Sequence, residues 1–365
     1  MARRGAGDYR PDTERSIEQA GDMAAKMILT GDINLMNVVD PLVPFSLVRD
    51  EFRSTDVVFA NLECCLCPPP SAHSLDNEGF FADPAVAGEA LKSAGIQAVG
   101  IANNVNYGET AITASIARLD EIGIPHAGAG SSRALARKPV ILERGGIRFG
   151  FLQRSSVYWP TNHEAGDNSA GIAVIRGHTA YQAPMHGSRP PANRPGIPPQ
   201  IVTWADKQYL QWFADDVAEL RGQADIVVAS CHWGVGREVL QYMSEIGHAA
   251  VDAGADIAIG HGPHYSLPVE IYRGKPIFYG LGSFSFHTGH RGHRHGDWLG
   301  MMVRAVCERS GIARVTFQFV RHDEQNRTVL RQLSDERAAF DQIAQESSSL
   351  GAELGSDGDQ VVVTR

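Results

Sequence analysis

The chain has 365 residues, of which 43% are hydrophobic and 21% charged, a composition typical of a soluble globular protein with a sizeable core. Its formal charge, 33 − 42 = −9, argues against extensive nucleic-acid binding, which needs a basic surface. No apolar run approaches the roughly 18 residues of a membrane span, and the polar N-terminus has no apolar signal stretch; we therefore expect a cytoplasmic protein without a membrane span.

Short β-branched runs alternate with amphipathic stretches along most of the chain. The predicted strands are Met27–Thr30, Val57–Ala60, Ala98–Ile101, Ile147–Leu152, Ile226–Ala229 and Ile257–Ile259. The predicted helices between them are Asp83–Ser93, Glu109–Ile122, Ala205–Leu220 and Tyr242–Ala253. Nearly continuous apolar strands separated by helices are typical of an α/β fold whose sheets are covered on both faces.

The pattern changes toward the C-terminus. Segments Lys275–Tyr279, Met301–Val306 and Ala313–Phe319 predict antiparallel strands that close the domain. A last predicted helix, Asp335–Gln345, precedes a Ser/Gly/Asp-rich tail that we expect to be loose. We therefore divide the chain into a polar extension (1–25), a main domain (26–330) and a C-terminal helix with a loose tail (331–365).

One segment lacks hydrophobic periodicity. From His178 to Pro199, within an insertion at 178–204, the sequence is rich in Pro, Arg and Gly. A long irregular loop inside a compact domain is usually functional or disordered. We interpret it as a lid or substrate-binding loop, with a plain surface insertion as the alternative.

Polar side chains follow the predicted strands one after another. They are Asp32, Glu63, the pair Asn103 and Asn104, His232, and the pair His261 and His264. Open α/β sheets collect ligands at such strand ends. Carboxylate, amide oxygen and imidazole together suit divalent cations. The series therefore predicts a shared metal site.

The same segments carry a resemblance to a known family. They are Gly31-Asp32, Asn61-Leu62-Glu63, Ala102-Asn103-Asn104, Gly128-Ala129-Gly130, His232-Trp233-Gly234, Gly254-Ala255-Asp256 through His264, and Lys275-Pro276-Ile277-Phe278-Tyr279 with Leu281-Gly282. In order and context the sequence resembles the CapA-like family of capsule and poly-γ-glutamate synthesis, related to the calcineurin-like metallophosphatases. The resemblance implies a metallophosphatase-like four-layer sandwich, two mixed sheets flanked by helices, with metal-binding loops at one end.

The resemblance also implies site residues. Carried over position by position, it makes metal ligands of Asp32, Glu63, Asn104, His232 and His264. His261 either ligates or supports a ligand, and His232 and His261 are candidate catalytic groups. One or two divalent ions (Mn, Zn, Fe or Ca) are implied as cofactor.

This chain departs from the family pattern in two places. Family members commonly carry His after the paired Asn and then Asp, whereas this chain has Val105 and Asn106. In metallophosphatases that His acts on the leaving group, and losing such a group typically costs about 10²–10⁴-fold in rate. The His that commonly follows His261 is Gly262 here. Both departures weaken the case for a complete two-metal phosphatase site.

A His-rich segment at 284–298 offers further imidazoles. We predict His287 and His295 with Asp297 as acid–base groups, and Arg291 and Arg294 as ligands for a carboxylate or phosphate. The alternative is a solvated loop.

Two further residues are candidate substrate contacts. They are Asn103, at the end of a strand, and Trp233, directly after a predicted ligand. For Trp233, core packing at the strand end is the alternative.

Three functions remain open. The first is a metal-dependent hydrolase that cleaves a phosphoester or an amide such as a γ-glutamyl bond through metal-activated water. The second is a metal-dependent peptide Cα epimerase, as in lasso-peptide biosynthesis, which needs acid–base groups but no leaving-group acid. The third is a non-catalytic accessory factor in capsule or poly-γ-glutamate synthesis. The expected partners are a peptide, a polyglutamate-like chain or a phosphorylated small molecule; the sequence does not indicate an oligomeric state.

Overall fold

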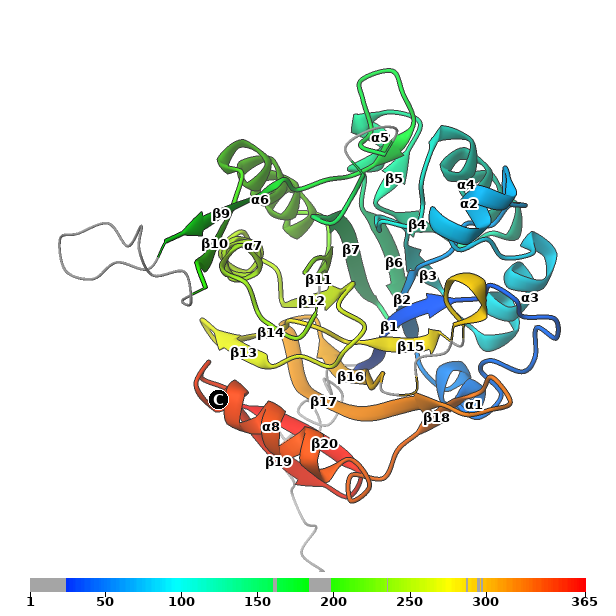
Figure 1. Cartoon of the computed structure of the whole chain (residues 1–365). Coiled ribbons are helices and arrows are strands. Elements are labelled where there is room, and N and C mark those ends of the chain that lie inside the picture. The colour runs from blue at the N-terminus through cyan, green and yellow to red at the C-terminus, as the bar shows by residue number, and fades with distance from the viewer. Residues whose placement is uncertain are drawn as a thin grey trace, which may run out of the picture.

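The structure is a computed structural model of the chain, and it describes residues 24–159, 163–183, 198–234, 236–286, 288–293, 296 and 298–365. Two large mixed sheets lie face to face in the centre, and helices cover their outer faces (Figure 1). The predicted α/β four-layer sandwich is therefore confirmed. Residues 1–23 of the predicted extension lie outside the described residues, and the first strand already begins at Ala25.

The larger sheet has ten strands and runs β19-β20-β17-β16-β1-β2-β3-β4, with β15 paired to β1 and β18 to β17. Its strands are β1 (Ala25–Asn34), β2 (Val57–Leu62), β3 (Ala98–Gly100), β4 (His126–Ala127), β15 (Ser283–Phe286), β16 (Gly300–Glu308), β17 (Gly311–His322), β18 (Thr328–Leu330), β19 (Glu353–Asp357) and β20 (Gln360–Thr364). Strands β1 to β4 are parallel to one another, and β16 and β17 are antiparallel.

The smaller sheet has six strands in the order β13-β14-β12-β11-β7-β6. They are β6 (Val140–Arg144), β7 (Ile147–Ser155), β11 (Ile226–His232), β12 (Ile257–His261), β13 (Val269–Tyr272) and β14 (Lys275–Phe278). Two minor pairs complete the strands: β5 (Ala129–Gly130) with β8 (Gly171–Ile172), and β9 (Gly177–Gln182) with β10 (Gln200–Ala205). The three central strands β7, β11 and β12 are parallel, so their carboxyl ends meet at one edge.

Most helices lie in the two outer layers (Figure 1). The helices are α1 (Arg49–Arg53), α2 (Ala72–Asn77), α3 (Pro84–Ala94), α4 (Glu109–Ile122), α5 (Arg133–Ala136), α6 (Lys207–Arg221), α7 (Gln241–Asp252) and α8 (Arg337–Ser348), with a 3-10 turn at His290–Gly292. Helix α8 instead packs at the edge of the sandwich against β13 and β19 (Figure 1). Helices α3 and α4 lie on the side of the larger sheet, and α6 and α7 on the side of the smaller one (Figure 1). The five predicted helices are all confirmed, and α4 has the predicted bounds.

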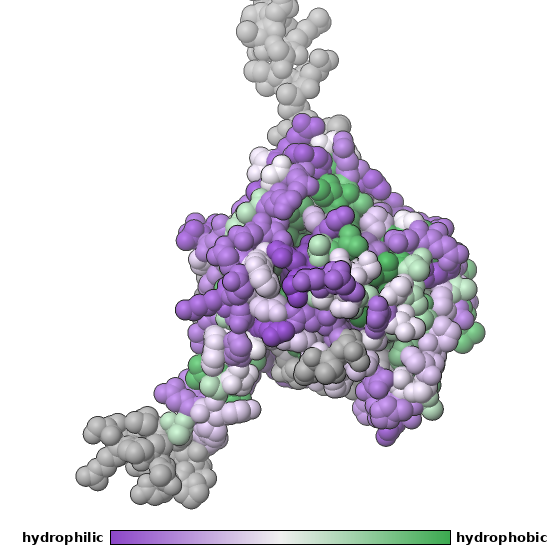
Figure 2. All heavy atoms as spheres, turned by 90° about the horizontal axis from the view of Figure 1, so that it is seen from above, coloured by the Kyte–Doolittle hydropathy of each residue, from purple (hydrophilic) through white to green (hydrophobic). Residues whose placement is uncertain are grey.

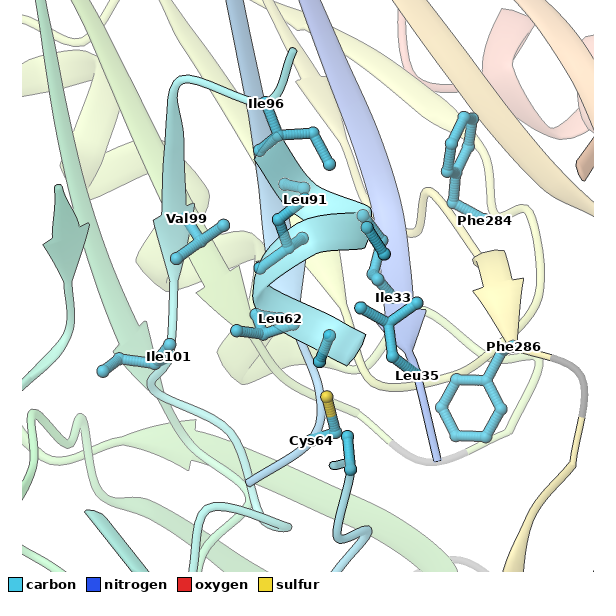
Figure 3. Close-up of a cluster of buried hydrophobic side chains, with 14 of the residues drawn as sticks. Ile33, Leu35, Leu62, Cys64, Leu91, Ile96, Val99, Ile101, Phe284 and Phe286 are labelled. Carbon is cyan, nitrogen blue, oxygen red and sulfur yellow. The ribbon is translucent and has the colours of Figure 1, made fainter. Parts of the chain in front are cut away.

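Apolar side chains between the layers hold the sandwich together. Between the sheets, Phe59 of β2 stacks on Phe151 of β7 at 4.7 Å between ring centroids. On the outer side of the larger sheet, Leu91 of α3 packs with Leu62 and Val99 of the strands beneath it (Figure 3). Fully burying a side chain of this size contributes about 1.5–3 kcal/mol, so these contacts fix how the strand ends face each other.

The predicted loose C-terminal tail is wrong. Strands β19 and β20 form an antiparallel hairpin, and β20 pairs with β17 at the edge of the larger sheet. The turn Asp357-Gly358-Asp359 next to the β-branched run Val361–Val363 is a hairpin signal. Val361 is fully buried, so burying this run orders the tail.

The Pro-rich insertion is only partly irregular. Strand β9 takes up the predicted irregular residues His178–Gln182, and it pairs with β10 to form an arm that projects from the body beside α7 (Figure 1). Residues 184–197 of the insertion lie outside the described residues. Its role as a lid or substrate-binding loop stays a prediction.

The surface seen from above is mostly hydrophilic, and hydrophobic residues gather in smaller areas (Figure 2). Among the described residues, no helix has both the length and the hydrophobicity that crossing a membrane requires. The five cysteines are free thiols and are all buried.

Candidate metal centre

The register of both sheets brings the polar strand ends together. In the larger sheet, Asp32 of β1 lies opposite Asn61 of β2, and Glu63 is the first residue after β2. In the smaller sheet, His232 of β11 lies opposite His261 of β12. Because the two sheets face each other, these rows form one polar cluster at the carboxyl ends of their strands.

Three of the predicted ligands form a compact group. Asp32, Glu63 and His264 each offer an atom, and these atoms all lie within 4.8 Å of one another. His264 Nδ1 is 3.2 Å from Asp32 Oδ2, and His264 Nε2 is 3.8 Å from Glu63 Oε1. Asp32 and Glu63 are fully buried, whereas the His264 side chain keeps 22% exposure. The group thus has an acceptor-rich interior and one side open to solvent.

Two further histidines border this group. His232 Nε2 lies 3.8 Å from Glu63 Oε1, and His261 Nδ1 lies 3.3 Å from Asp32 Oδ1. Among the described residues, neither His232 Nε2 nor either ring nitrogen of His261 has an aligned hydrogen-bond partner, and Asn104 Oδ1 is likewise buried without one. Buried polar atoms are rarely left unpaired, so these atoms have capacity for a ligand.

The two carboxylates differ in their affinity for protons. Burial disfavours the charged form of Asp32, but the adjacent imidazoles of His261 and His264 outweigh it and hold the pKa of Asp32 far below its usual range. Burial, and next the charge of Asp32, raise the pKa of Glu63 well above its usual range. Without a cation, the raised pKa of Glu63 favours a proton on this buried pair. A bound cation would stabilise both carboxylates in their charged form.

The pKa values of the three histidines also shift in opposite directions. Burial lowers the pKa of His232 to about 4 and also lowers the pKa of His261. Burial acts in the same direction on His264, but Glu63 and Asp32 more than compensate and raise its pKa. Neutral imidazoles are the form that ligates metal, so His232 and His261 are suited to that role near neutral pH.

The residues of this cluster have the chemistry that a divalent cation requires. The donor set contains two buried carboxylates, neutral imidazole nitrogen and an unpaired amide oxygen, which is the chemistry of Mn, Zn or Fe sites. Asp32, Glu63 and His264 are the residues that could hold the ion. His232 Nε2 lies 3.8 Å from Glu63 Oε1, and Asn104 follows Asn103, whose Nδ2 donates to Asn61 Oδ1 at 3.3 Å.

An amide network behind the carboxylates was not predicted from the sequence. Asn61 Nδ2 donates to Asp32 Oδ1 at 2.9 Å and to Glu63 Oε2 at 3.4 Å. Its Oδ1 accepts from Gln153 Nε2 at 3.0 Å, so a side chain of the smaller sheet orients the carboxylates of the larger one. Gly100 leaves the space for this: a Cβ there would lie 2.3 Å from Gln153 Cδ.

The backbone at His264 is held in an uncommon conformation. His264 has φ 63°, and its ring stacks on Trp298 at 4.3 Å between centroids and contacts Phe286 at 4.9 Å. Such non-glycine residues are uncommon and concentrate at functional sites. Gly262, with φ 103°, would bring a Cβ to 3.0 Å from His232. A histidine at position 262 would therefore crowd His232, a candidate ligand, in this chain.

Val105 and Asn106, the two positions after Asn104 that depart from the family pattern, contribute no acid–base group to the cluster. Val105 is buried in the apolar cluster that also contains Leu91 and Leu62. Asn106 Nδ2 donates to Ile101 O at 3.1 Å and stabilises the turn. The loop therefore supplies no imidazole and no carboxylate at these positions.

Not every predicted contact residue presents a free group. Asn103 is fully buried, and its Nδ2 donates to Leu62 O at 2.8 Å. Trp233 is also fully buried, and its Nε1 donates to Tyr279 O at 2.8 Å, so the packing alternative describes it. Arg291 is exposed and donates to Asn77 Oδ1 at 3.2 Å. The remaining predicted groups of the His-rich segment, His287, Arg294, His295 and Asp297, lie outside the described residues.

Fold and site together define an α/β sandwich protein with a candidate divalent-metal centre at the strand ends. The profile of the family described as "Bacterial capsule synthesis protein PGA_cap" matches residues 13–288. The chain therefore belongs to the PGA_cap family, which confirms the CapA-like resemblance.

Named relatives agree with this assignment. The chain is 27% identical to the PGA biosynthesis protein CapA of Bacillus subtilis over 250 residues, 67% of this chain and 57% of that protein. It is 28% identical to a probable polyglutamine synthesis accessory protein of Mycobacterium tuberculosis, over 64% of this chain and 56% of the relative. The chain thus spans little more than half the length of these two relatives.

Among solved structures, a novel phosphatase from Mycoplasma pneumoniae aligns with a TM-score of 0.47 and 11% identity, covering 82% of this chain and 94% of that one. This likeness is too distant to inform the function.

Proposed function

We propose that the protein is a metal-dependent hydrolase that cleaves an amide bond of a γ-glutamyl chain or a phosphoester. The observation that carries the proposal is the group of Asp32, Glu63 and His264, with the unpaired Nε2 of His232 at 3.8 Å from Glu63 Oε1. A divalent ion bound there would act as a Lewis acid and activate water for attack on a carbonyl or phosphoryl centre.

The chain's own residues have distinct tasks in this proposal. Asp32 stays ionised because His261 and His264 stabilise its charge, and Asn61 fixes its orientation. His232 stays neutral because it is buried, so we assign it to metal ligation rather than to proton transfer. Its Nδ1 lies 3.4 Å from Ser155 Oγ, which leaves Nε2 for the ion.

Proton transfer then belongs to other groups. His287, His295 and Asp297 stay predictions for this role. The described residues on either side of them, Phe286 and Trp298, both contact the His264 ring. Both of these described residues of the His-rich segment therefore lie beside the candidate metal centre.

The substrate class is part of the proposal. The names of the relatives refer to PGA biosynthesis and polyglutamine synthesis. Together with the CapA-like resemblance, which implies poly-γ-glutamate, this supports an acidic γ-glutamyl chain as the first substrate to test. A phosphoester is the second, because the site retains acidic and imidazole groups that suit either reaction.

One observation favours the peptide Cα epimerase as a second candidate. Val105 is buried in the core, so its loop offers no acid for a leaving group. Epimerisation has no leaving group, and its demand is for acid–base groups and a cation that stabilises the enolate.

The test combines metal content with turnover. The full chain, purified without chelator or affinity tag, is analysed for metal and incubated with poly-γ-glutamate, with a chromogenic phosphoester, and with peptide in D₂O. The matched variants are Asp32→Asn and Asp167→Asn, the latter at a carboxylate with 80% exposure.

We expect near-stoichiometric metal and release of amine or phosphate in the native chain and in Asp167→Asn, with both lost in Asp32→Asn. Deuterium uptake without hydrolysis would replace the hydrolase by the epimerase. Metal binding without turnover would favour the accessory role. A chain that binds no Mn, Zn, Fe or Ca would contradict both enzymatic proposals.

A further inference from the structure

Two consecutive backbone carbonyls, those of Asn103 and Asn104, receive side-chain donors from the segment after β7. Their turn is linked to the candidate metal centre, because Asn103 Nδ2 donates at 3.3 Å to Asn61 Oδ1 and Asn61 Nδ2 bonds Asp32 and Glu63. His163 Nε2 lies 2.9 Å from Asn103 O, and Trp159 Nε1 donates to Asn104 O at 2.9 Å. The two donors belong to the smaller sheet's side of the molecule, whereas Asn103 and Asn104 follow β3 of the larger sheet. The contact therefore links the two sheets at their carboxyl ends.

The hydrogen bonds determine the tautomer of His163. The backbone N–H of Trp159 donates to His163 Nδ1 at 3.1 Å, so Nδ1 is the acceptor and the proton sits on Nε2. That proton points at Asn103 O. Both ring nitrogens of His163 are thus occupied, and the side chain is only 1% exposed. Since neither nitrogen is free, His163 does not replace the acid that is missing at Val105.

Packing makes the arrangement rigid. The ring of Tyr107 meets Trp159 edge-on at 5.8 Å and His163 edge-on at 5.7 Å between centroids. Aromatic pairs in this geometry contribute about 0.5–1.5 kcal/mol beyond their buried area. His163 itself is anchored, because its carbonyl accepts from Ile172 N at 2.7 Å.

The turn needs such support because β3 ends at Gly100 and no regular strand or helix includes Asn103 or Asn104. Asn103 is bonded through its amide to Leu62, but Asn104 Oδ1 is buried without a partner among the described residues. We propose that Trp159 and His163 are positioning residues that hold the Asn103–Asn104 backbone so that the Asn104 amide oxygen is available as a metal ligand. This inference rests on the metal centre of the proposed function.

The experiment measures Mn²⁺ affinity by calorimetry on the full chain, alongside the thermal midpoint of the metal-free protein. Trp159→Phe keeps an aromatic ring against Tyr107 and removes the N–H donor. His163→Leu removes both hydrogen bonds, whereas His163→Gln keeps a donor of similar reach. Trp204→Phe and His248→Gln are matched controls, since Trp204 lies on β10 and His248 on α7 bonds Glu270 at 2.8 Å.

We expect His163→Leu to weaken Mn²⁺ binding about 10- to 100-fold, as removing a group that orients a ligand does, and Trp159→Phe about 5-fold, as the loss of one hydrogen bond does. His163→Gln should stay within about 3-fold of the native chain, less than one hydrogen bond's effect, and both controls should leave affinity unchanged.

Native-like Mn²⁺ affinity in both Trp159→Phe and His163→Leu would overturn the inference while leaving the metal centre intact. A lowered thermal midpoint with unchanged affinity would do the same, because it would show a purely structural role. If His163→Leu does not fold, Trp159→Phe and His163→Gln decide. A native chain that binds no Mn²⁺ would instead refute the proposed metal centre itself.

Discussion

The two ends of strand β12 carry buried acidic clusters of opposite character. At its start, Asp256 is 4% exposed and bonds Arg221 Nη1 at 2.6 Å, Lys275 Nζ at 2.7 Å and Val227 N at 2.9 Å. At its end, His261 lies among Asp32, Glu63 and further imidazoles, with several buried atoms unpaired.

The difference shows how to distinguish a structural cluster from a binding site. Two cations and a backbone donor satisfy Asp256, so nothing is left for a ligand. The Asp32–Glu63 cluster has more acceptors than donors, and burial with the charge of Asp32 raises the pKa of Glu63. Breaking a balanced buried cluster costs stability, whereas altering an unbalanced one should mainly cost ligand affinity.

The largest expected effect is at the carboxyl end of the strands. Asp32→Asn removes a charged ligand of the proposed centre, so we expect Mn²⁺ affinity to fall by at least about 100-fold, the upper range for a mere orienting group. In the metal-free protein the change removes the repulsion between Asp32 and Glu63 but also the attraction of Asp32 to His261 and His264, so we expect a smaller effect on stability than on metal affinity. Calorimetry measures the Mn²⁺ affinity, and urea unfolding in chelator measures the metal-free stability. A large loss of metal-free stability with native affinity would show that the Asp32–Glu63 cluster is structural, as we argue for Asp256.

The converse change is Asp256→Ala. Breaking a buried ion pair costs about 3–5 kcal/mol, but Arg221 and Lys275 keep 33% and 37% exposure and can be hydrated, so we expect a loss of about 2 kcal/mol. Mn²⁺ affinity should not change. Urea unfolding against Asp167→Ala as surface control checks this; unchanged stability would show that the cluster is not structural.

A substitution that changes no charge can test the hydrogen-bond network of Asn61 and Gln153 behind the carboxylates. Gly100→Ala places a Cβ 2.3 Å from Gln153 Cδ, and forcing such contacts costs about 1–3 kcal/mol. Displacing Gln153 should also free Asn61 and weaken Mn²⁺ binding. Gly355→Ala is the control, because its Cβ would meet open space; equal behaviour of the two variants would rule out the network's role.

The smallest effect is a pH dependence that Glu63 should impose on the metal-free protein. Because its pKa in the folded state is raised above the ordinary 4.5, its contribution to stability is complete below pH 4.5 and is lost as pH rises through the raised pKa. Glu63→Gln should remove this contribution. Urea unfolding in chelator between pH 4 and pH 9 measures the difference; parallel curves would contradict the raised pKa.

Much of the fold could be predicted because its elements have strong local patterns. Helix α4 coincides with its predicted range Glu109–Ile122, since its apolar residues recur with helical period. The C-terminal hairpin was missed although Asp357-Gly358-Asp359 predicts a turn. Its order depends on pairing with β17, some 45 residues earlier in the chain, and composition does not reveal such non-local pairing.

The candidate site shows the same limit. Asp32, Glu63 and His264 could be predicted because each follows an apolar strand, and the structure brings them together. Gln153, Trp159 and His163 gave no comparable signal. Their roles depend on partners in the opposite sheet, such as Asn61 and the carbonyls of Asn103 and Asn104.

The sequence by itself determined the strand–helix order, the family and the series of polar residues at the strand ends, because each follows from patterns within a few neighbouring residues. Only the tertiary structure decided which of these atoms are already paired and which are left for a ligand. It placed Asn103 and Trp233 in protein hydrogen bonds and left His232 Nε2 and Asn104 Oδ1 without them. The physical reason is that hydrogen-bond partners and burial are set by the packing of two sheets whose strands are far apart in the chain.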